Sequence, residues 1–134
     1  MQPSEPYAKS PYKSKGGLRR ILNALRYSLQ GLKAAIKYEA AFRQELGLAI
    51  LLVPAAFFLG RTTAEVFILI MSVMLVLMAE LLNSAVEAVA DALSVEINPL
   101  LGRAKDLGSA AVMLMLLFTV AVWAAVAISR FFVI

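Results

Sequence analysis

The chain has 134 residues, of which 61% are hydrophobic and only 16% are charged, and its mean hydropathy is +0.80. These values are too apolar for an ordinary soluble domain of this size, and they favour a membrane protein. The sequence contains no Cys and no His, which excludes thiolate nucleophiles, disulfides, thiolate or imidazole zinc sites and a Ser-His-Asp triad. Acid–base chemistry therefore falls to carboxylates, Lys or Tyr.

The basic residues are unevenly distributed, because most of the 13 Lys and Arg residues precede the first long apolar run. Under the positive-inside rule, this end of the chain faces the cytoplasm. A basic chain can also bind nucleic acid, but basic residues beside membrane spans favour an anionic lipid surface. We therefore expect no nucleic-acid partner. The apolar run that begins near Leu46 is followed by no small-residue cleavage site, so we also expect no cleaved signal peptide.

The N-terminal part of the chain changes character at Leu18. Residues 1–17 combine Pro, Ser, Gly and Lys without apolar periodicity, which predicts a disordered tail. From Leu18 to Ile36, hydrophobic residues recur at steps of three and four, and basic residues occupy the other side. This pattern predicts a basic amphipathic helix over residues 18–38 that lies in the plane of the lipid headgroups. Packing of this helix on a soluble core is the less favoured alternative, because no such core is visible.

Three long apolar stretches follow, and they predict membrane spans at about residues 43–60, 64–93 and 107–130. A bilayer core of about 30 Å requires about 20 helical residues to cross. Pro99 and Gly102 predict a turn in the second connection, and we expect Asp106 to cap the third span at Leu107.

The charges of the two connections give the expected orientation. The first, "GRTTAE", carries one Arg and one Glu, whereas the second, "SVEINPLLGRAKD", carries Arg103 and Lys105 and shares the basic character of the N-terminus. Three spans then place the C-terminus on the side of the membrane away from the cytoplasm. We predict an all-α membrane protein, with one amphipathic surface helix and three transmembrane helices in a single domain over residues 18–134.

A face of carboxylates interrupts the second span. At about 100° per residue, the side chains of Glu80, Asn83, Glu87 and Asp91 fall within an arc of about 80°. An ionised side chain at membrane depth costs at least about 2.5–3.5 kcal/mol. Such a face needs protons, cations, a metal or water as its partner, and a purely structural role is the less favoured alternative.

A second polar cluster, "KYEAAFRQE", contains Glu39, Arg43 and Glu45. Glu39 and Arg43 are four residues apart and could simply pair on a helix surface. Alternatively, Glu39 and Glu87 from different helices can hold a Mg²⁺ ion that takes its remaining ligands from water and polyphosphate. The chain has neither a P-loop nor a GxGxxG motif. Groups able to pair with a nucleotide remain in the second connection: Glu96, Arg103, Lys105 and Asp106.

Three segments, "AAFRQE", "SVMLVLMAELLNSAVEAVAD" and "GRAKDLGSAAV", resemble the bacterial integral-membrane diacylglycerol kinase family in their order and spacing. The resemblance extends from about Arg20 to Ile128. It implies a homotrimer of three-span protomers with an N-terminal surface helix in the bacterial inner membrane. It further implies transfer of the ATP γ-phosphate to the primary hydroxyl of diacylglycerol, which yields phosphatidic acid.

The resemblance also assigns residue roles. It implies that Glu80 is the general base, that Asn83 supports the catalytic cluster, and that Glu39 and Glu87 bind Mg²⁺. The implied nucleotide contacts are Arg20, Tyr27, Glu39, Glu87, Glu96, Asn98, Lys105 and Asp106. The implied lipid contacts are Arg20, Ser28, Glu80 and Ser109. Two positions depart from the family pattern, because Asn98 stands where His is frequent and Ala92 stands where Arg is frequent.

Two alternatives to diacylglycerol phosphorylation remain open. Relatives within this family phosphorylate undecaprenol, although "GRAKDLGSAAV" looks more like the diacylglycerol branch. A small proton-coupled multidrug transporter also uses a membrane-embedded Glu, but it should need neither ATP nor Mg²⁺. The charged second connection and the three-span count argue against the transporter.

Overall fold

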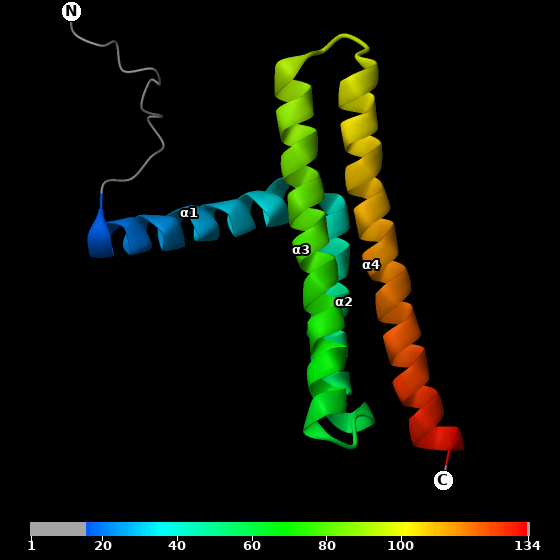
Figure 1. The fold of residues 1–134 in the computed structure, drawn as a ribbon. Helices are drawn as coiled ribbons and strands as arrows, with labels where there is room; N and C mark the ends of the chain where they lie inside the picture. The colour runs from blue at the N-terminus through cyan, green and yellow to red at the C-terminus, as the bar shows by residue number, and fades with distance from the viewer. Residues whose placement is uncertain (1–15, 134) are drawn as a thin grey trace, which may run out of the picture. The chain divides into compact units, whose positions relative to one another are not determined.

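The computed structural model describes residues 16–133, and residues 1–15 of the tail expected at residues 1–17 lie outside this range. The described chain is all-helical, as predicted, with α1 (Gly17–Tyr38), α2 (Ala40–Leu59), α3 (Thr63–Leu93) and α4 (Pro99–Phe132) (Figure 1). Helices α2, α3 and α4 are each long and apolar enough to cross a membrane. The predicted surface helix and three spans thus correspond to the four observed helices.

The chain divides into two compact units, one that ends at Ala34 and one that begins at Ala35. The first unit contains most of α1, which begins after two glycines, Gly16 and Gly17, with φ angles of 50° and 64°. Only glycine adopts this left-handed region without strain. Along α1 the large hydrophobic side chains, such as Leu22, Leu25 and Leu29, are exposed, as expected for a helix whose apolar side meets lipid.

In the second unit, α3 is the central helix, because it packs against both α2 and α4 while α2 and α4 have little contact with each other. A buried cluster joins these elements and consists of Ala35, Phe42, Ala49, Val73 and Leu77. Trp123 from α4 packs against this cluster. Side chains on the inward face of α3 are therefore enclosed from two sides, and this position determines which polar groups are buried.

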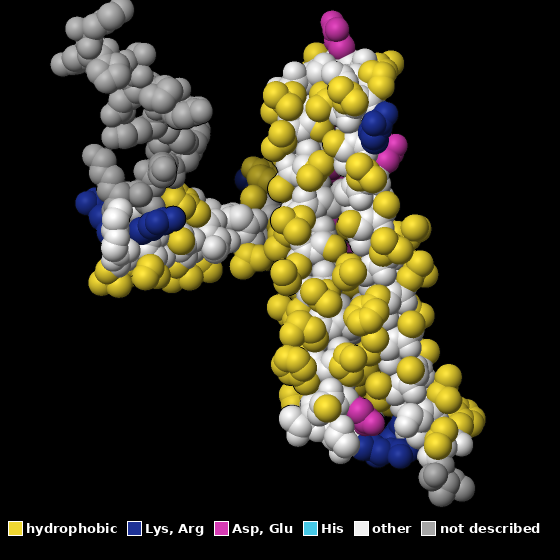
Figure 2. All heavy atoms as spheres, in the orientation of Figure 1, with side chains coloured by type: hydrophobic (Ala, Val, Ile, Leu, Met, Phe, Trp, Pro, Cys, Tyr) yellow, Lys and Arg dark blue, Asp and Glu magenta, His cyan; other side chains and the backbone are white. Residues whose placement is uncertain are grey.

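On the face that Figure 2 shows, large hydrophobic side chains cover most of α3 and α4, and large hydrophobic side chains of α2 are exposed as well. Phe58, Leu82 and Val120, for example, are exposed by 82%, 67% and 66%. Exposure to water costs roughly 25 cal/mol per Å² of apolar surface, whereas exposure to lipid tails carries no such penalty. The chain is therefore a multi-pass membrane protein.

Helix α4 begins earlier than predicted. Asn98 is its N-cap, and the Asn98 Oδ1 atom accepts hydrogen bonds from the backbone N–H groups of Leu100 (2.9 Å) and Leu101 (3.4 Å). The expected start at Leu107, the Asp106 cap and the turn at Gly102 were wrong. An Asn followed by Pro is a strong helix start, and the charged residues after it end the apolar pattern without ending the helix.

The opposite end of the second unit is closed by Arg61, in the connection between α2 and α3. Its Nη2 atom donates a hydrogen bond to the carbonyl of Ser129 at 2.7 Å and another to the carbonyl of Arg130. The last carbonyls of a helix have no partners within the helix. Arg61 therefore stabilises the C-terminal turn of α4 and ties it to the α2–α3 connection.

Candidate functional site

Three polar side chains are buried among residues 16–133, namely Ser72, Glu80 and Asn83, and all three lie on α3. The Ser72 hydroxyl donates to the Leu69 carbonyl at 2.7 Å and accepts from Trp123 Nε1 at 3.2 Å. Ser72 is thus explained by packing between α3 and α4. Glu80 and Asn83 remain as buried polar groups that such packing does not explain.

Glu80 is only 6% exposed and lies among other carboxylates. The negative charges of Glu87 and Glu39 act on Glu80, and the charge of Glu80 acts on Glu45. The structure therefore brings the predicted base close to both predicted metal ligands. The ion pair found in the described part of the chain involves none of these four carboxylates, so their mutual repulsion favours binding of a cation.

Asn83 is 9% exposed, and its Nδ2 atom donates a hydrogen bond to Glu87 Oε1 at 3.0 Å. An ionised carboxylate accepts hydrogen bonds and donates none. The NH₂ group of the Asn83 amide is therefore the end that faces Glu87. The other end, Asn83 Oδ1, is buried and has no hydrogen-bond partner among the described residues. Such an unpaired acceptor costs about 1–3 kcal/mol. Unpaired buried acceptors are rare in structural cores, so this atom points to a functional role.

Glu39 and Arg43 of the second polar cluster are arranged differently from the surface ion pair that their four-residue spacing allowed. Arg43 Nη1 donates to the carbonyls of Ile36 (2.9 Å) and Lys37 (3.1 Å) at the end of α1, and among described residues it forms no ion pair with Glu39. Glu39 is the N-cap residue of α2, but its side chain makes no capping hydrogen bond. The Glu39 carboxylate is therefore available to another partner.

Glu45 belongs to the second polar cluster of the sequence, but sequence reasoning gave it no role. Its Oε2 atom is buried and has no hydrogen-bond partner within residues 16–133. A signal was present, because Glu45 comes three residues after the buried Phe42 and four before the buried Ala49, on one face of α2. The helical phase of the buried residues would have placed it toward α3.

The carboxylate face of α3 becomes more exposed toward the C-terminal end of the helix. Glu87 is half-buried, and Asp91 is exposed and pairs with Lys105 of α4, with 3.0 Å between Lys105 Nζ and Asp91 Oδ1. The face thus extends from a buried acid to an exposed ion pair. This gradient connects the interior of the bundle with its exposed end.

The remaining predicted site residues lie on exposed surfaces. Glu96 and Asn98 belong to the α3–α4 connection, and Asp106 and Ser109 lie on α4. Arg20, Tyr27 and Ser28 lie on the part of α1 in the first unit, where the Ser28 hydroxyl donates to the Ala24 carbonyl at 2.9 Å. The participation of these residues in a site stays a prediction.

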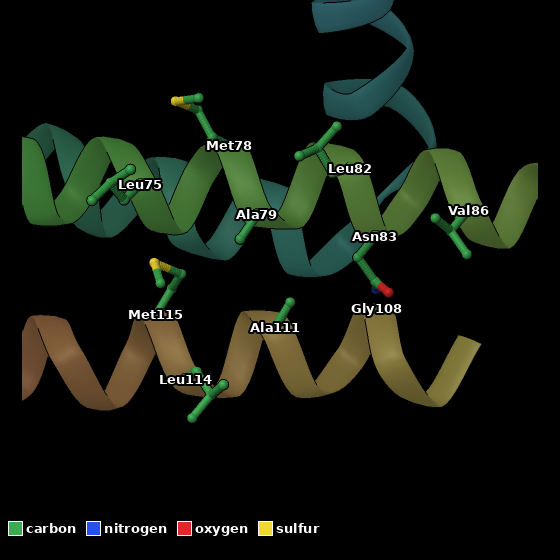
Figure 3. A pocket seen from close by; sticks show the side chains of 10 residues that line it. All are labelled: Leu75, Met78, Ala79, Leu82, Asn83, Val86, Gly108, Ala111, Leu114 and Met115. Atoms are coloured by element: carbon green, nitrogen blue, oxygen red, sulfur yellow. The ribbon is translucent and has the colours of Figure 1, made fainter. Parts of the chain in front are cut away.

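An apolar cavity of about 380 Å³ lies between α3 and α4 (Figure 3). Asn83 is the polar side chain in its wall, and Figure 3 shows this side chain pointing toward Gly108 of α4. The other residues that line the cavity are Leu75, Met78, Ala79, Leu82, Val86, Ala111, Leu114 and Met115. The cavity therefore offers space for an apolar chain next to a polar group.

The fold and the buried Glu80 define an α-helical membrane protein with a carboxylate cluster around one of its spans. The family model for prokaryotic diacylglycerol kinase matches residues 26–127. The chain belongs to this family and is therefore a kinase.

Similar proteins named diacylglycerol kinase occur in several bacteria. The chain is 52% identical to the one from Haemophilus influenzae over 107 residues, which cover 80% of this chain and 91% of that protein. It is 47% identical to the one from Pseudomonas aeruginosa over 117 residues, with 87% and 95% covered. It is 48% identical to the one from Escherichia coli strain K12 over 116 residues, with 86% and 94% covered.

Proposed function

We propose that this chain transfers the γ-phosphate of ATP to the primary hydroxyl of diacylglycerol, which yields phosphatidic acid and ADP. Membership of the prokaryotic diacylglycerol kinase family supports a lipid substrate, and the names of relatives at 47–52% identity support diacylglycerol in particular. The observation that carries the proposal is the cluster of Glu80, Glu45 and Glu87 in helices long enough to span a membrane, with Glu39 at the N-cap of α2.

Glu80 acts as the general base in this proposal. It takes the proton of the lipid hydroxyl as the hydroxyl oxygen bonds to the γ-phosphorus and the bond from phosphorus to ADP breaks. Glu80 is seven residues from Glu87 along α3, which is about 10 Å at 1.5 Å per residue. A lipid hydroxyl just below the headgroups lies at a similar depth, so the buried base and the more exposed Glu87 suit a substrate that spans this boundary.

Glu39 and Glu87 hold Mg²⁺ in this proposal, and the residues present fit that ion. Among the described residues, no group of three or more His, Cys, Asp or Glu side chains could hold a metal. Mg²⁺ is typically bound by one or two carboxylates together with substrate phosphates. When bound, the ion would neutralise charge on the transferred phosphate. Phosphoryl transfer requires this neutralisation of charge more than it requires covalent machinery. The Asn83 amide orients the Glu87 carboxylate through its hydrogen bond.

The wider site extends over exposed residues and neighbouring protomers. We assign nucleotide contacts to Arg20, Tyr27, Glu96, Asn98, Lys105 and Asp106, and lipid contacts to Arg20, Ser28 and Ser109. The active form is a homotrimer in the inner membrane, with the N-terminus in the cytoplasm and the C-terminus in the periplasm.

The test is phosphate transfer by the purified protein in mixed micelles with ATP and Mg²⁺, with diacylglycerol and undecaprenol offered separately. Turnover of diacylglycerol supports the proposal. Turnover of undecaprenol alone contradicts the substrate assignment but retains the mechanism. Turnover of neither lipid rejects the kinase proposal and favours a proton-coupled transporter.

A further inference from the structure

Gly108 lies in the interior of α4. At such a position, a helix with glycine is less stable than one with alanine by about 1 kcal/mol. It is far from either end of the helix, so it has no role as a cap. Its Cα atom faces the side chain of Asn83 across the α3–α4 interface (Figure 3). The reason for a glycine here therefore lies in what it contacts.

The space beside Gly108 is filled by the Asn83 amide. A Cβ atom at residue 108 would overlap Asn83 Oδ1, and it would lie 3.3 Å from Asn83 Cγ and 3.7 Å from Asn83 Cα. The last distance is ordinary van der Waals contact, so the backbone of α3 could stay in place. The amide oxygen is the atom for which no room remains. A methyl group at this position would therefore displace the Asn83 amide rather than separate the two helices.

The Asn83 amide cannot move without losing its contact with Glu87. Its Nδ2 atom donates to Glu87 Oε1 at 3.0 Å, while its Oδ1 atom lies buried against Gly108 and has no conventional partner among residues 16–133. A glycine Cα–H group is a weak donor that stabilises such close helix contacts. Rotation of the amide away from α4 would lengthen the bond to Glu87 and leave that carboxylate without its orienting donor.

We propose that Gly108 is a positioning residue, whose missing side chain seats the Asn83 amide so that the amide holds Glu87 in its working orientation. This inference rests on the proposed role of Glu87 in phosphoryl transfer. Gly108 touches neither reacting group itself. It acts through Asn83, because Gly108 of α4 contacts the Asn83 amide and this amide donates a hydrogen bond to Glu87 of α3.

The experiment compares Gly108→Ala with Gly102→Ala in mixed micelles. Gly102 is a matched control, because it lies on the same helix and an added Cβ would meet no atom within 4 Å. Loss of the outer partner of a metal ligand typically costs about 10- to 100-fold in metal affinity or activity. We expect Gly108→Ala to raise the half-saturating Mg²⁺ concentration and lower kcat within this range. Gly102→Ala should change neither.

A second readout is independent of turnover. The chain has only three Asn residues, at positions 23, 83 and 98, and three Gln residues, so side-chain amide signals in a ¹⁵N–¹H NMR spectrum can be assigned by substitution. We expect Gly108→Ala to shift the Asn83 amide signals and to leave those of Asn98 in place. Unchanged Asn83 signals together with unchanged Mg²⁺ dependence would overturn the inference.

Two further variants separate the causes. In an Asn83→Ala background, Gly108→Ala should have no further effect on Mg²⁺ dependence, and an additive loss would mean that the methyl group acts on helix packing instead. If Gly108→Ala does not fold, recovery of folded protein in the double variant supports the inference, and failure to recover overturns it. If Glu87→Gln leaves Mg²⁺ dependence unchanged, the proposed metal ligand fails whatever Gly108 does.

Discussion

The Asn83 side chain donates a hydrogen bond to Glu87 one helical turn further along α3, with 3.0 Å between Nδ2 and Oε1. Asn83 is buried, whereas Glu87 is half-buried. The contact therefore links the interior of the bundle to the more accessible part of the carboxylate face. Glu80 lies on the same face and deeper in α3, and the negative charge of Glu87 acts on it.

Replacement of Glu80 by Gln should remove turnover while the protein still assembles and binds ATP. The amide keeps the size of the side chain but cannot take a proton, and loss of a general base typically costs about 10²–10⁴-fold in rate. The measurement is kcat with diacylglycerol, beside binding of a fluorescent ATP analogue. Glu65→Gln, in the first turn of α3, is the matched control and should retain activity. Substantial residual turnover of Glu80→Gln would reject the base assignment.

Glu39→Ala and Glu87→Ala should each increase the Mg²⁺ concentration needed for half-maximal rate. Each change removes one of the two proposed protein ligands. Because Mg²⁺ that is bound mainly through phosphates has few protein ligands, the loss of one weakens its binding. A titration of rate against Mg²⁺ at saturating ATP gives the result for both variants. If neither titration curve moves relative to the wild type, the two carboxylates are not the ligands.

The helices and the carboxylate face could be predicted from the sequence because both follow from local periodicity. Hydropathy marks stretches long enough to span a bilayer, and a rotation of about 100° per residue places Glu80, Asn83 and Glu87 together. The start of α4 was missed, because Pro99 and Gly102 were interpreted as a turn, whereas Asn98 and Pro99 begin the helix. The contact between Gly108 and Asn83 depends on the register of α4 against α3, which periodicity within one helix does not contain.

Arg61→Gln should destabilise the fold without changing the chemistry. The substitution removes two hydrogen bonds to the carbonyls of Ser129 and Arg130 at the end of α4. The site is exposed, so we expect a loss of about 1 kcal/mol. Thermal unfolding in detergent measures this loss, and the Mg²⁺ titration should stay as in the wild type. An unchanged unfolding midpoint would mean that Arg61 does not stabilise the end of α4.

Asn98 has a structural role and a proposed nucleotide contact, and two substitutions distinguish them. Its Oδ1 atom caps α4 through the backbone N–H groups of Leu100 and Leu101, so Asn98→Ala should destabilise the protein by about 1 kcal/mol. Asn98→Ser retains a capping oxygen and should keep most of that stability. If the side chain also contacts the nucleotide, both variants raise the KM for ATP, because neither presents the amide. An unchanged KM for ATP in both would leave Asn98 as a helix cap alone, and the nucleotide contact would have to be withdrawn.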